Sequence, residues 1–309
     1  MAGNEQINSI GAWLKGRFGS KVIKLSIDGG FTCPNRDGTA GTGGCTFCSA
    51  EGSGELSSDI PGQIRLLSEK WPNVEKYMVY FQSHTSTYAP ADRLRRQYEA
   101  ALSAETGGGD IVGIAIATRP DCLGDDVLGL LSELNEKTFL WVELGLQTIH
   151  GDRINRCYDL SVYDKAVDEL TARGIRVVTH LILGLPGESR SDMEESLRYV
   201  CSSPIFGLKL HMLNVVKGSP LSKTCPDYVS FDTPEEYIDL VCDLLEIIPP
   251  EITIHRLNGD VPRKLLISPG WSYKKRTILN GIAHEMKSRG SFQGCRTSGH
   301  FSGSSRPSL

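Results

Sequence analysis

Residues 21–48, KVIKLSIDGGFTCPNRDGTAGTGGCTFC, join an apolar run to a glycine-rich loop that carries three cysteines. The run at 22–27 is mostly apolar and is followed by two adjacent glycines, so it predicts a strand and then a loop. Cys33, Cys45 and Cys48 therefore lie on the loop that leaves this strand, not on a helix. The glycines let the loop wrap tightly and present N–H groups to whatever the sulfurs bind.

The spacing of these cysteines suits a soft metal centre. Cys45 and Cys48 form a C-x-x-C pair around Phe47, and no Cys or His in the next thirty residues completes a tetrahedral zinc site. Three thiolates without a nearby fourth ligand suit an iron–sulfur cubane that leaves one iron open. A treble-clef or ribbon zinc site is the alternative. It needs a second C-x-x-C or a histidine pair, and the first histidine downstream is His84.

Composition bounds the class of protein. The chain has 309 residues, 39% of them hydrophobic, which is enough for a full core in one or two domains. A net charge of −4 excludes a globally basic nucleic-acid binder but leaves room for a local basic patch. No apolar leader and no membrane-length apolar run occurs, so we expect no membrane contact. Nine cysteines without framework spacing, and a thiolate cluster that needs reducing conditions, predict a cytoplasmic protein.

Strand-like runs alternate with helical stretches along the chain. The expected strands are 22–27, 77–82, 111–117, 139–147, 175–184 and 207–215. The expected helices between them are 60–70, 91–104, 124–135, 161–173 and 189–201. Such alternation requires parallel strands with crossover helices, so the predicted fold class is α/β, a partial (βα)6 TIM-type barrel with a mainly helical C-terminal extension.

Four segments follow from this pattern. We expect an N-terminal helix in 1–19 that covers the bottom of the barrel, the barrel itself in 20–230, an extension packing on it in 231–295, and a disordered Ser/Gly/Pro-rich tail in 296–309. Chemistry in a (βα) barrel sits at the carboxyl ends of the strands, and the polar residues of this chain gather there. A single lumen facing them is therefore expected.

Taken together, these segments resemble the radical S-adenosylmethionine (radical SAM) enzymes, specifically the YhcC/YtqA-like group, which is similar to the catalytic subunit of Elongator. The resemblance covers nearly the whole chain through TCPNRDGT, GGCTFC, IATRPDCL, VELGLQT, HLILGLPGE and IHRL. It implies a [4Fe–4S] cluster bound by Cys33, Cys45 and Cys48, with S-adenosylmethionine as the second cofactor. One electron, from a flavodoxin- or ferredoxin-type donor, would cleave S-adenosylmethionine to a 5′-deoxyadenosyl radical that abstracts hydrogen from a substrate.

The resemblance also suggests contacts to S-adenosylmethionine. Phe47 would pack near the adenine. Gln82, Ser83 and Thr85 follow the second strand, where related enzymes hold the amino group of the cofactor. His180, at the end of the fifth strand, is a further candidate for cofactor or substrate contact.

Gln147 and Arg156 match a pair of residues that bind the ribose and the carboxylate of S-adenosylmethionine in the family. An arginine suits the carboxylate, because its guanidinium can donate two parallel hydrogen bonds to it. The chain departs from the family at this point. The segment before Arg156 is shorter by about one helical turn, and the usual NRGH continues here as Arg156-Cys157-Tyr158.

Several candidates have a structural alternative. Glu143 is either a contact to S-adenosylmethionine or a buried carboxylate paired with Arg119. His211 and His255, like His180, are expected at strand ends near the mouth, where they either contact ligands or are structural. The basic residues of the C-terminal part form either a solvated helix face or a phosphate-binding rim; they are Arg263, Lys264, Lys274, Lys275 and Arg276. The remaining cysteines lack ligand spacing and are expected to be core or surface thiols; they are Cys122, Cys157, Cys201, Cys225, Cys242 and Cys295.

Three functions remain open. The first is a radical SAM enzyme that acts on a nucleic-acid base, for which similarity to Elongator suggests a tRNA wobble uridine or its side chain. The second is a radical SAM enzyme that acts on a small metabolite or a protein. The third is a non-catalytic iron–sulfur or RNA-binding protein with an eroded S-adenosylmethionine site.

Overall fold

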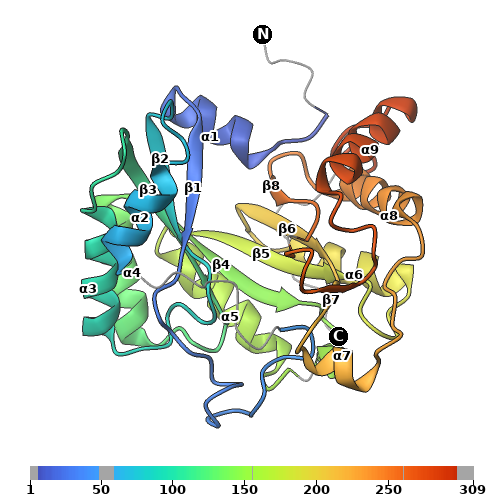
Figure 1. Ribbon diagram of the computed structural model, residues 1–309, viewed down its shortest axis with the longest axis horizontal. Helices are drawn as coiled ribbons and strands as arrows, with labels where there is room; N and C mark the ends of the chain where they lie inside the picture. Colours follow the sequence, from blue (N-terminus) through green and yellow to red (C-terminus); the bar gives the residue numbers. More distant parts are fainter. Residues whose placement is uncertain (1–5, 49–58, 155, 260, 298–309) are drawn as a thin grey trace.

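The computed structural model describes residues 6–48, 59–154, 156–259 and 261–297. Its centre is a curled, seven-stranded parallel sheet with the strand order β1-β2-β3-β4-β5-β6-β8 (Figure 1). The strands of this sheet are β1 (Val22–Ile27), β2 (Lys76–Phe81), β3 (Asp110–Thr118), β4 (Phe139–Gln147), β5 (Arg176–Leu183), β6 (Gly207–Met212) and β8 (Thr253–Arg256). A separate antiparallel ribbon pairs β7 (Val215–Val216) with β9 (Leu266–Ser268).

This architecture confirms the α/β partial barrel expected from the sequence. All six expected strands are present, and a seventh, β8, pairs in parallel with β6, with Thr253 opposite Gly207. β8 comes from the segment 231–295, so the expected C-terminal extension contributes a strand to the sheet. Because β1 and β8 are the two edges and do not pair with each other, the barrel stays open along one seam.

Helices connect the strands and cover the outer face of the sheet. They are α1 (Ile10–Phe18), α2 (Ile60–Ser68), α3 (Ala91–Leu102), α4 (Asp125–Lys137), α5 (Leu160–Ala172), α6 (Arg190–Cys201), α7 (Pro220–Thr224), α8 (Pro234–Ile247) and α9 (Lys275–Ser288), with a 3-10 turn η1 (Gly151–Ile154) after β4. In Figure 1, α2, α3 and α4 lie on the left of the sheet and the α8–α9 pair lies on the right. Residues 1–5 of the expected N-terminal helix and 298–309 of the expected tail lie outside the described residues.

The strands are apolar almost throughout because they are covered on both faces. In β2, Tyr77 and Val79 pack outward against the helices, whereas Met78 and Tyr80 face the lumen, and all four are buried. This alternation follows from the two-residue period of a strand. It explains why the expected strands read as continuous apolar runs.

Helix α1 covers the amino-terminal end of the barrel. The ring of Trp13 stacks on Phe139, with centroids 5.6 Å apart, and meets Phe206 edge-on at 4.9 Å. Phe139 in turn contacts Trp141 at 5.8 Å. This aromatic layer fills the lumen at one end, so open space is left at the carboxyl ends of the strands.

The segment before α1 pairs with the edge strand β8. Ser9 forms a bridge to Ile254 of β8, and the Ile254 N–H donates to Asn8 O at 2.8 Å. The Asn8 N–H donates to Gln293 Oε1 at 2.9 Å, and the Gln293 N–H donates to Gln6 O at 2.8 Å. The two ends of the described chain are thus joined at β8.

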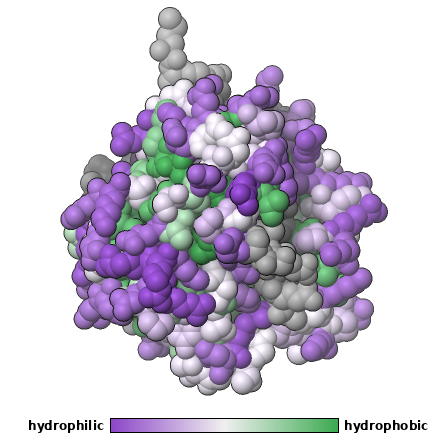
Figure 2. All heavy atoms as spheres, turned by 60° about the vertical axis from the view of Figure 1, so that its left-hand side comes forward, coloured by the Kyte–Doolittle hydropathy of each residue, from purple (hydrophilic) through white to green (hydrophobic). Residues whose placement is uncertain are grey.

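Among the described residues, few large apolar side chains are exposed. Figure 2 shows a face covered mostly by hydrophilic residues, with apolar residues in smaller groups between them, as expected for amphipathic helices packed on a sheet. Within the described ranges, no helix has both the length and the apolar character needed to cross a membrane.

Candidate active site

A cavity of about 350 Å³ lies at the carboxyl ends of the strands. Its wall combines the cysteine loop, the ends of β2 to β6 and β8, and the segment between η1 and α5. The residues proposed from the sequence that line it are Cys33, Cys45, Phe47, Cys48, Gln82, Thr85, Glu143, Gln147, Arg156 and His180. Ser83 does not line the cavity, and its buried hydroxyl has no hydrogen-bond partner among the described residues.

The cysteine loop is held by its own backbone and by its neighbours. The Arg36 N–H donates to Cys33 O at 2.8 Å, and the Cys48 N–H donates to Cys45 O at 3.0 Å. The Leu221 N–H of α7 donates to Thr46 O at 3.0 Å, which fixes the C-x-x-C turn from outside the loop. Two glycines just before this turn have φ near +84°, a conformation that favours glycine.

The thiols of the C-x-x-C turn have divergent acidities. The hydrogen bond with Cys48 is the main reason that the pKa of the Cys45 thiol falls to about 6; Asn35 and the charges of Arg119 and Arg36 act in the same direction, against burial. The same hydrogen bond, with burial, raises the pKa of Cys48 well above its ordinary value. Asn35 contributes directly, because its Nδ2 donates to Cys45 Sγ at 3.2 Å.

The three sulfurs are spread more widely than zinc ligands. Cys33, Cys45 and Cys48 line one cavity, but their sulfurs do not all lie within 4.8 Å of one another. In a tetrahedral zinc site the zinc–sulfur bonds are about 2.3 Å long, so the sulfur ligands lie closer to one another than the 4.8 Å limit that these three sulfurs exceed. The donor set therefore fits a polynuclear iron–sulfur cluster better than a single zinc ion.

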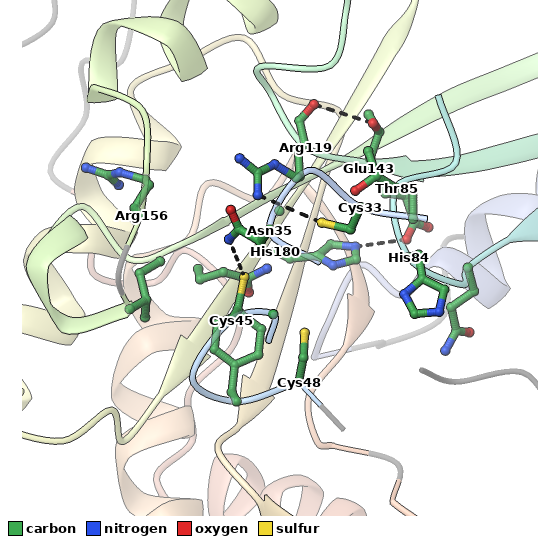
Figure 3. Close-up of a pocket in the computed structure, with 18 of the residues that line it drawn as sticks. Cys33, Asn35, Cys45, Cys48, His84, Thr85, Arg119, Glu143, Arg156 and His180 are labelled. Carbon is green, nitrogen blue, oxygen red and sulfur yellow. Dashed lines mark hydrogen bonds and ion pairs between the residues drawn. The ribbon is translucent and has the colours of Figure 1, made fainter. Parts of the chain in front are cut away.

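Two polar side chains link the cysteine loop to the segment after η1. Arg119, at the end of β3, donates from Nη2 to Cys157 Sγ at 2.7 Å and lies with Nη1 3.9 Å from Cys33 Sγ. Asn35 Oδ1 accepts from Cys157 Sγ at 3.3 Å, so Asn35 contacts both Cys157 and Cys45. Figure 3 shows Arg119 and Asn35 between Arg156 and the sulfurs. Cys157 lines the cavity, which the sequence analysis did not predict.

A buried ion pair lies at the inner end of the cavity. Glu143 Oε2 accepts from Lys209 Nζ and from His180 Nε2, the latter at 2.8 Å, while its Oε1 accepts from Trp141 Nε1 at 2.9 Å. Lys209 also donates to Tyr80 OH at 2.9 Å. The alternative of a structural carboxylate fits these contacts.

The expected pairing of Glu143 with Arg119 is wrong. The guanidinium of Arg119 pairs instead with Asp121, through Nη2 to Oδ2 at 2.6 Å. The strand register explains the difference, because His180 lies opposite Lys209 on β6 and opposite Gly145 on β4. This register brings the Lys209 ammonium next to the Glu143 carboxylate.

Burial governs the acidities of this network. Desolvation alone would raise the pKa of Glu143, but the Lys209 charge and the His180 hydrogen bond hold it well below its ordinary value. Desolvation lowers the pKa of Lys209, and the charge of Lys24 adds to this. Desolvation and the Lys209 charge lower the pKa of His180 to about 4. Glu143 therefore carries a charge and His180 is neutral near neutral pH.

The guanidinium of Arg156 holds the backbone around it. Its Nε, Nη1 and Nη2 donate to Tyr158 O, Thr148 O and Ile149 O at 3.0, 2.9 and 3.1 Å. These bonds leave two of the five N–H groups for a ligand. The Tyr158 ring lies beside the Arg156 and Arg119 guanidinium groups, at 5.5 and 5.7 Å. The altered family motif thus forms a compact cation–π stack at the cavity wall.

The three histidines differ in position. His180 and His211 line the cavity with ring centroids 5.3 Å apart, and His211 Nε2 is buried without a partner among the described residues. The expected place of His255 at the mouth is wrong. A bulge between β6 and β8 turns it toward Trp141, and Arg256, which lies opposite Lys209, lines the cavity instead.

Backbone strain is concentrated at the cavity. Among the described residues, the two non-glycine residues with positive φ are His84 at 55° and Gln147 at 73°, and both line it. Gln147 follows a register shift between β4 and β5. Such conformations persist where the surrounding structure over-determines them, often at functional sites.

The basic C-terminal residues lie outside the cavity wall. The Arg263 guanidinium stacks on the ring of Tyr273, 4.6 Å from its centroid, and Tyr273 is 39% exposed. Lys264, Lys274 and Arg276 are exposed in the same segment. This segment therefore presents an exposed pair of a cation and an aromatic ring, Arg263 and Tyr273. The two alternatives from the sequence, a solvated helix face and a phosphate-binding rim, both remain open.

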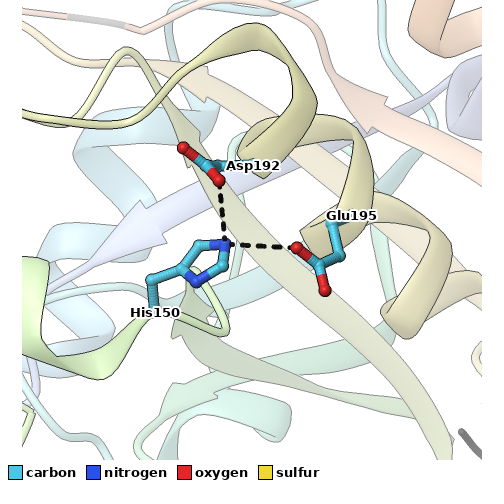
Figure 4. Close-up of side chains that lie close together, drawn as sticks. All are labelled: His150, Asp192 and Glu195. Carbon is cyan, nitrogen blue, oxygen red and sulfur yellow. Dashed lines mark ion pairs between the residues drawn. The ribbon is translucent and has the colours of Figure 1, made fainter. Parts of the chain in front are cut away.

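One further ligand set lies away from the cavity wall. His150 Nε2 points toward Asp192 Oδ1 and Glu195 Oε2, each 3.9 Å away (Figure 4). These three atoms are close enough to hold a divalent cation. Asp192 already forms the capping box of α6 with Ser189, and acidic groups stabilise a helix N-terminus without any ion.

Comparisons with known proteins show the family to which the chain belongs. The family model of the Radical SAM superfamily matches residues 36–200, and that of the Radical_SAM C-terminal domain matches residues 205–288. The uncharacterized protein YtqA of Bacillus subtilis (strain 168) is 46% identical over 91% of this chain and 89% of its own length. Protein YhcC of Escherichia coli (strain K12) is 37% identical over 88% of this chain and 89% of its own length.

A solved structure shares the fold. The archaeal Methanocaldococcus infernus Elp3 with an N-terminal deletion superimposes with a TM-score of 0.67 at 18% identity, over 88% of this chain and 64% of that one. From the family models and the two bacterial relatives, the chain belongs to the radical SAM superfamily, whose enzymes use a [4Fe–4S] cluster and S-adenosylmethionine as cofactors.

Proposed function

We propose that this chain reductively cleaves S-adenosylmethionine at a [4Fe–4S] cluster bound by Cys33, Cys45 and Cys48. The observation that supports this proposal is the gathering of the three thiols on one cavity wall, spread too widely for zinc. When bound, the two cofactors supply a 5′-deoxyadenosyl radical that abstracts a hydrogen atom from the substrate. The chain's own residues bind the cofactors, orient the substrate and exclude water.

The cavity wall offers suitable contacts for S-adenosylmethionine. Phe47, packed against an apolar cluster that includes Ile154, offers a face to the adenine. Gln82 and Thr85, after β2, offer polar groups to the amino end, with Ser83 behind them. We assign the ribose to Gln147.

Three further candidates, Arg156, Glu143 and His180, would lie at the edge of S-adenosylmethionine or beneath it. Arg156 offers its two free N–H groups to the carboxylate of S-adenosylmethionine. Glu143 and His180 form the polar floor. The aromatic layer below fills the lumen at its amino-terminal end, and the cavity lies at the carboxyl ends of the strands, where Gln82, Glu143 and His180 line it.

For the substrate we propose a tRNA wobble uridine or its side chain. Support comes from the fold shared with Elp3 and from the exposed segment around Tyr273. Arg263, Lys264 and Lys274 offer positive charge to phosphates, and the aromatic ring offers a stacking surface to an unpaired base. A small metabolite or a protein side chain is the alternative that a cavity of about 350 Å³ also accommodates.

A non-catalytic role is favoured by one observation. Each of the three guanidinium nitrogens of Arg156 already donates to a backbone carbonyl. This is expected if the segment no longer binds S-adenosylmethionine. The remaining N–H groups and the intact triad weigh against this alternative.

Radical SAM enzymes in general need an electron donor, and we propose a one-electron donor of flavodoxin or ferredoxin type. Because cluster thiolates require reducing conditions, we place the protein in the cytoplasm.

Two measurements test the proposed function. The anaerobically reconstituted protein with a strong reductant and S-adenosylmethionine should release 5′-deoxyadenosine slowly without substrate, and the Cys45→Ala variant should release none. Loss of the gene should remove or alter one modified nucleoside in total tRNA. An intact cluster without cleavage supports the non-catalytic alternative, whereas cleavage with unchanged tRNA nucleosides supports a small-molecule or protein substrate.

A further inference from the structure

A fourth thiol stands in the same cavity as the three cysteines of the triad. Cys157, on the segment between η1 and α5, lines the cavity and has an exposed side chain. Four of the nine cysteines thus share one cavity wall. The other five do not line it.

One side chain lies between the Cys157 thiol and each of two triad sulfurs, those of Cys33 and Cys45. Arg119 lies between Cys157 and Cys33, with Nη2 and Nη1 at 2.7 and 3.9 Å from the two sulfurs. Asn35 lies between Cys157 and Cys45, with contacts of 3.3 and 3.2 Å. No three of these four sulfurs lie within 4.8 Å of one another, whereas the sulfur ligands of a single tetrahedral zinc ion lie closer together.

The position of Cys157 is fixed by its neighbours. The Arg156 N–H donates to Gly151 O at 3.0 Å, and Tyr158 OH donates to Gly145 O at 3.1 Å. The Arg119 guanidinium holds the Cys157 sulfur, because its Nη2 donates to Cys157 Sγ at 2.7 Å. The Cys157 sulfur is therefore held at the cavity wall by its contacts with Arg119 and Asn35.

A [4Fe–4S] cubane has four irons, and the triad supplies three protein ligands. We infer that Cys157 is a fourth thiolate ligand, which binds the open iron until the amino and carboxylate groups of S-adenosylmethionine displace it. This inference rests on the proposed function. Ligation releases the thiol proton to solvent, and displacement returns it, so no electron is transferred in the exchange. S-adenosylmethionine then competes with an intramolecular ligand, which weakens its apparent affinity.

The test compares wild type with Cys157→Ala, and uses Cys122→Ala as the matched control, because Cys122 lies nearby but does not line the cavity. Each protein is reconstituted anaerobically with ⁵⁷Fe and studied by Mössbauer spectroscopy. Wild type and the control should show four equivalent sulfur-ligated irons, with one distinct iron appearing on addition of S-adenosylmethionine. Cys157→Ala should show the distinct iron from the start and should bind S-adenosylmethionine about tenfold more tightly by equilibrium dialysis.

Alkylation gives a second readout that needs no variant. Iodoacetamide, followed by peptide mass spectrometry, should modify Cys157 in cluster-free wild type, spare it in the cluster-loaded protein, and modify it again once S-adenosylmethionine is added. Identical spectra for wild type and Cys157→Ala, or alkylation of Cys157 in the loaded protein without S-adenosylmethionine, overturn this inference alone. If wild type assembles no cluster, the proposed function fails together with it.

Discussion

Lys209 and Glu143 form an ion pair inside the barrel, with side chains 1% and 0% exposed. Lys209 comes from β6 and Glu143 from β4, and the His180 ring between them also donates to the carboxylate. The pair occupies the inner end of a cavity whose outer wall carries the cysteine loop.

Removal of one partner should leave the other charged and unpaired. We expect Lys209→Ala to lower the free energy of unfolding by about 3–5 kcal/mol, measured by urea denaturation. The double variant Lys209→Met/Glu143→Gln should regain much of this loss, because it leaves no isolated charge. Lys137→Ala, at an exposed position on α4, is the control. A single variant as stable as wild type would contradict the assigned pair.

Acidic pH should destabilise the protein through His180. Its pKa is about 4 in the folded chain against 6.5 for the unperturbed group, so the unfolded chain binds more protons in this window. The contribution of His180 to stability is complete above about pH 6.5 and is lost as the pH falls toward 4, to a limit of about 3 kcal/mol. Unfolding free energies measured between pH 7 and 4 should fall less steeply for His180→Asn than for wild type. His284→Asn, at an exposed position on α9, should follow wild type.

Cluster assembly should depend on the triad and not on remote thiols. We expect about four irons and four sulfides per chain after anaerobic reconstitution. Cys45→Ala should hold almost none, whereas Cys225→Ala, at an exposed position outside the cavity wall, should match wild type. Colorimetric iron and sulfide determination gives the result. Stoichiometric zinc with no cluster would refute the central assignment.

Arg156 should affect the binding of S-adenosylmethionine more than assembly of the cluster. Arg156→Ala removes three hydrogen bonds that hold the segment before α5, and it removes the charge offered to the carboxylate. We expect the dissociation constant for S-adenosylmethionine to rise about tenfold or more with iron content unchanged. Equal affinity of the variant and wild type in equilibrium dialysis would show that the residue acts only on the backbone.

Salt should weaken binding to tRNA if the segment around Tyr273 meets phosphates. Arg263→Glu/Lys274→Glu should flatten the plot of log affinity against log salt by about 0.7 to 0.9 for each lost contact. Lys70→Glu/Lys137→Glu makes the same charge change at two exposed positions, one two residues after α2 and one at the last residue of α4, and should keep the wild-type slope. Titration of labelled bulk tRNA at several salt concentrations measures these slopes. Equal, negligible binding by all three proteins would argue against a nucleic-acid substrate.

The sequence predicted what depends on local pattern. The six long strands were recognisable because parallel strands buried on both faces become continuous apolar runs, as in 139–147, which matches β4. The triad was recognisable because cysteine spacing is itself the chemical signal. The short strand β8 was recognisable as an apolar run in the mainly helical C-terminal part, but its four residues, which include a histidine and an arginine, gave no signal that it joins the sheet beside β6.

Contacts between distant parts of the chain were not predictable, because they leave no local pattern in the sequence. Glu143 pairs with Lys209 because of the register between β4, β5 and β6, and no local signal in the sequence gives that register. A bulge of one residue exchanges the places of His255 and Arg256. Cys157 reaches the cavity through the path of a shortened loop, although its departure from the family motif was a usable signal.

The pairing of Asn8 and Ser9 with Ile254 of β8 sets an order of events during synthesis. Both residues leave the ribosome early, but their partner Ile254 is made near the end of the chain, and Arg256 of the cavity wall follows two residues later. A nascent chain therefore presents the cysteine loop long before the last part of the cavity wall, Arg256, has been made. We expect iron and sulfide to be delivered after translation is complete, so that carriers meet a finished barrel and not an emerging thiol loop.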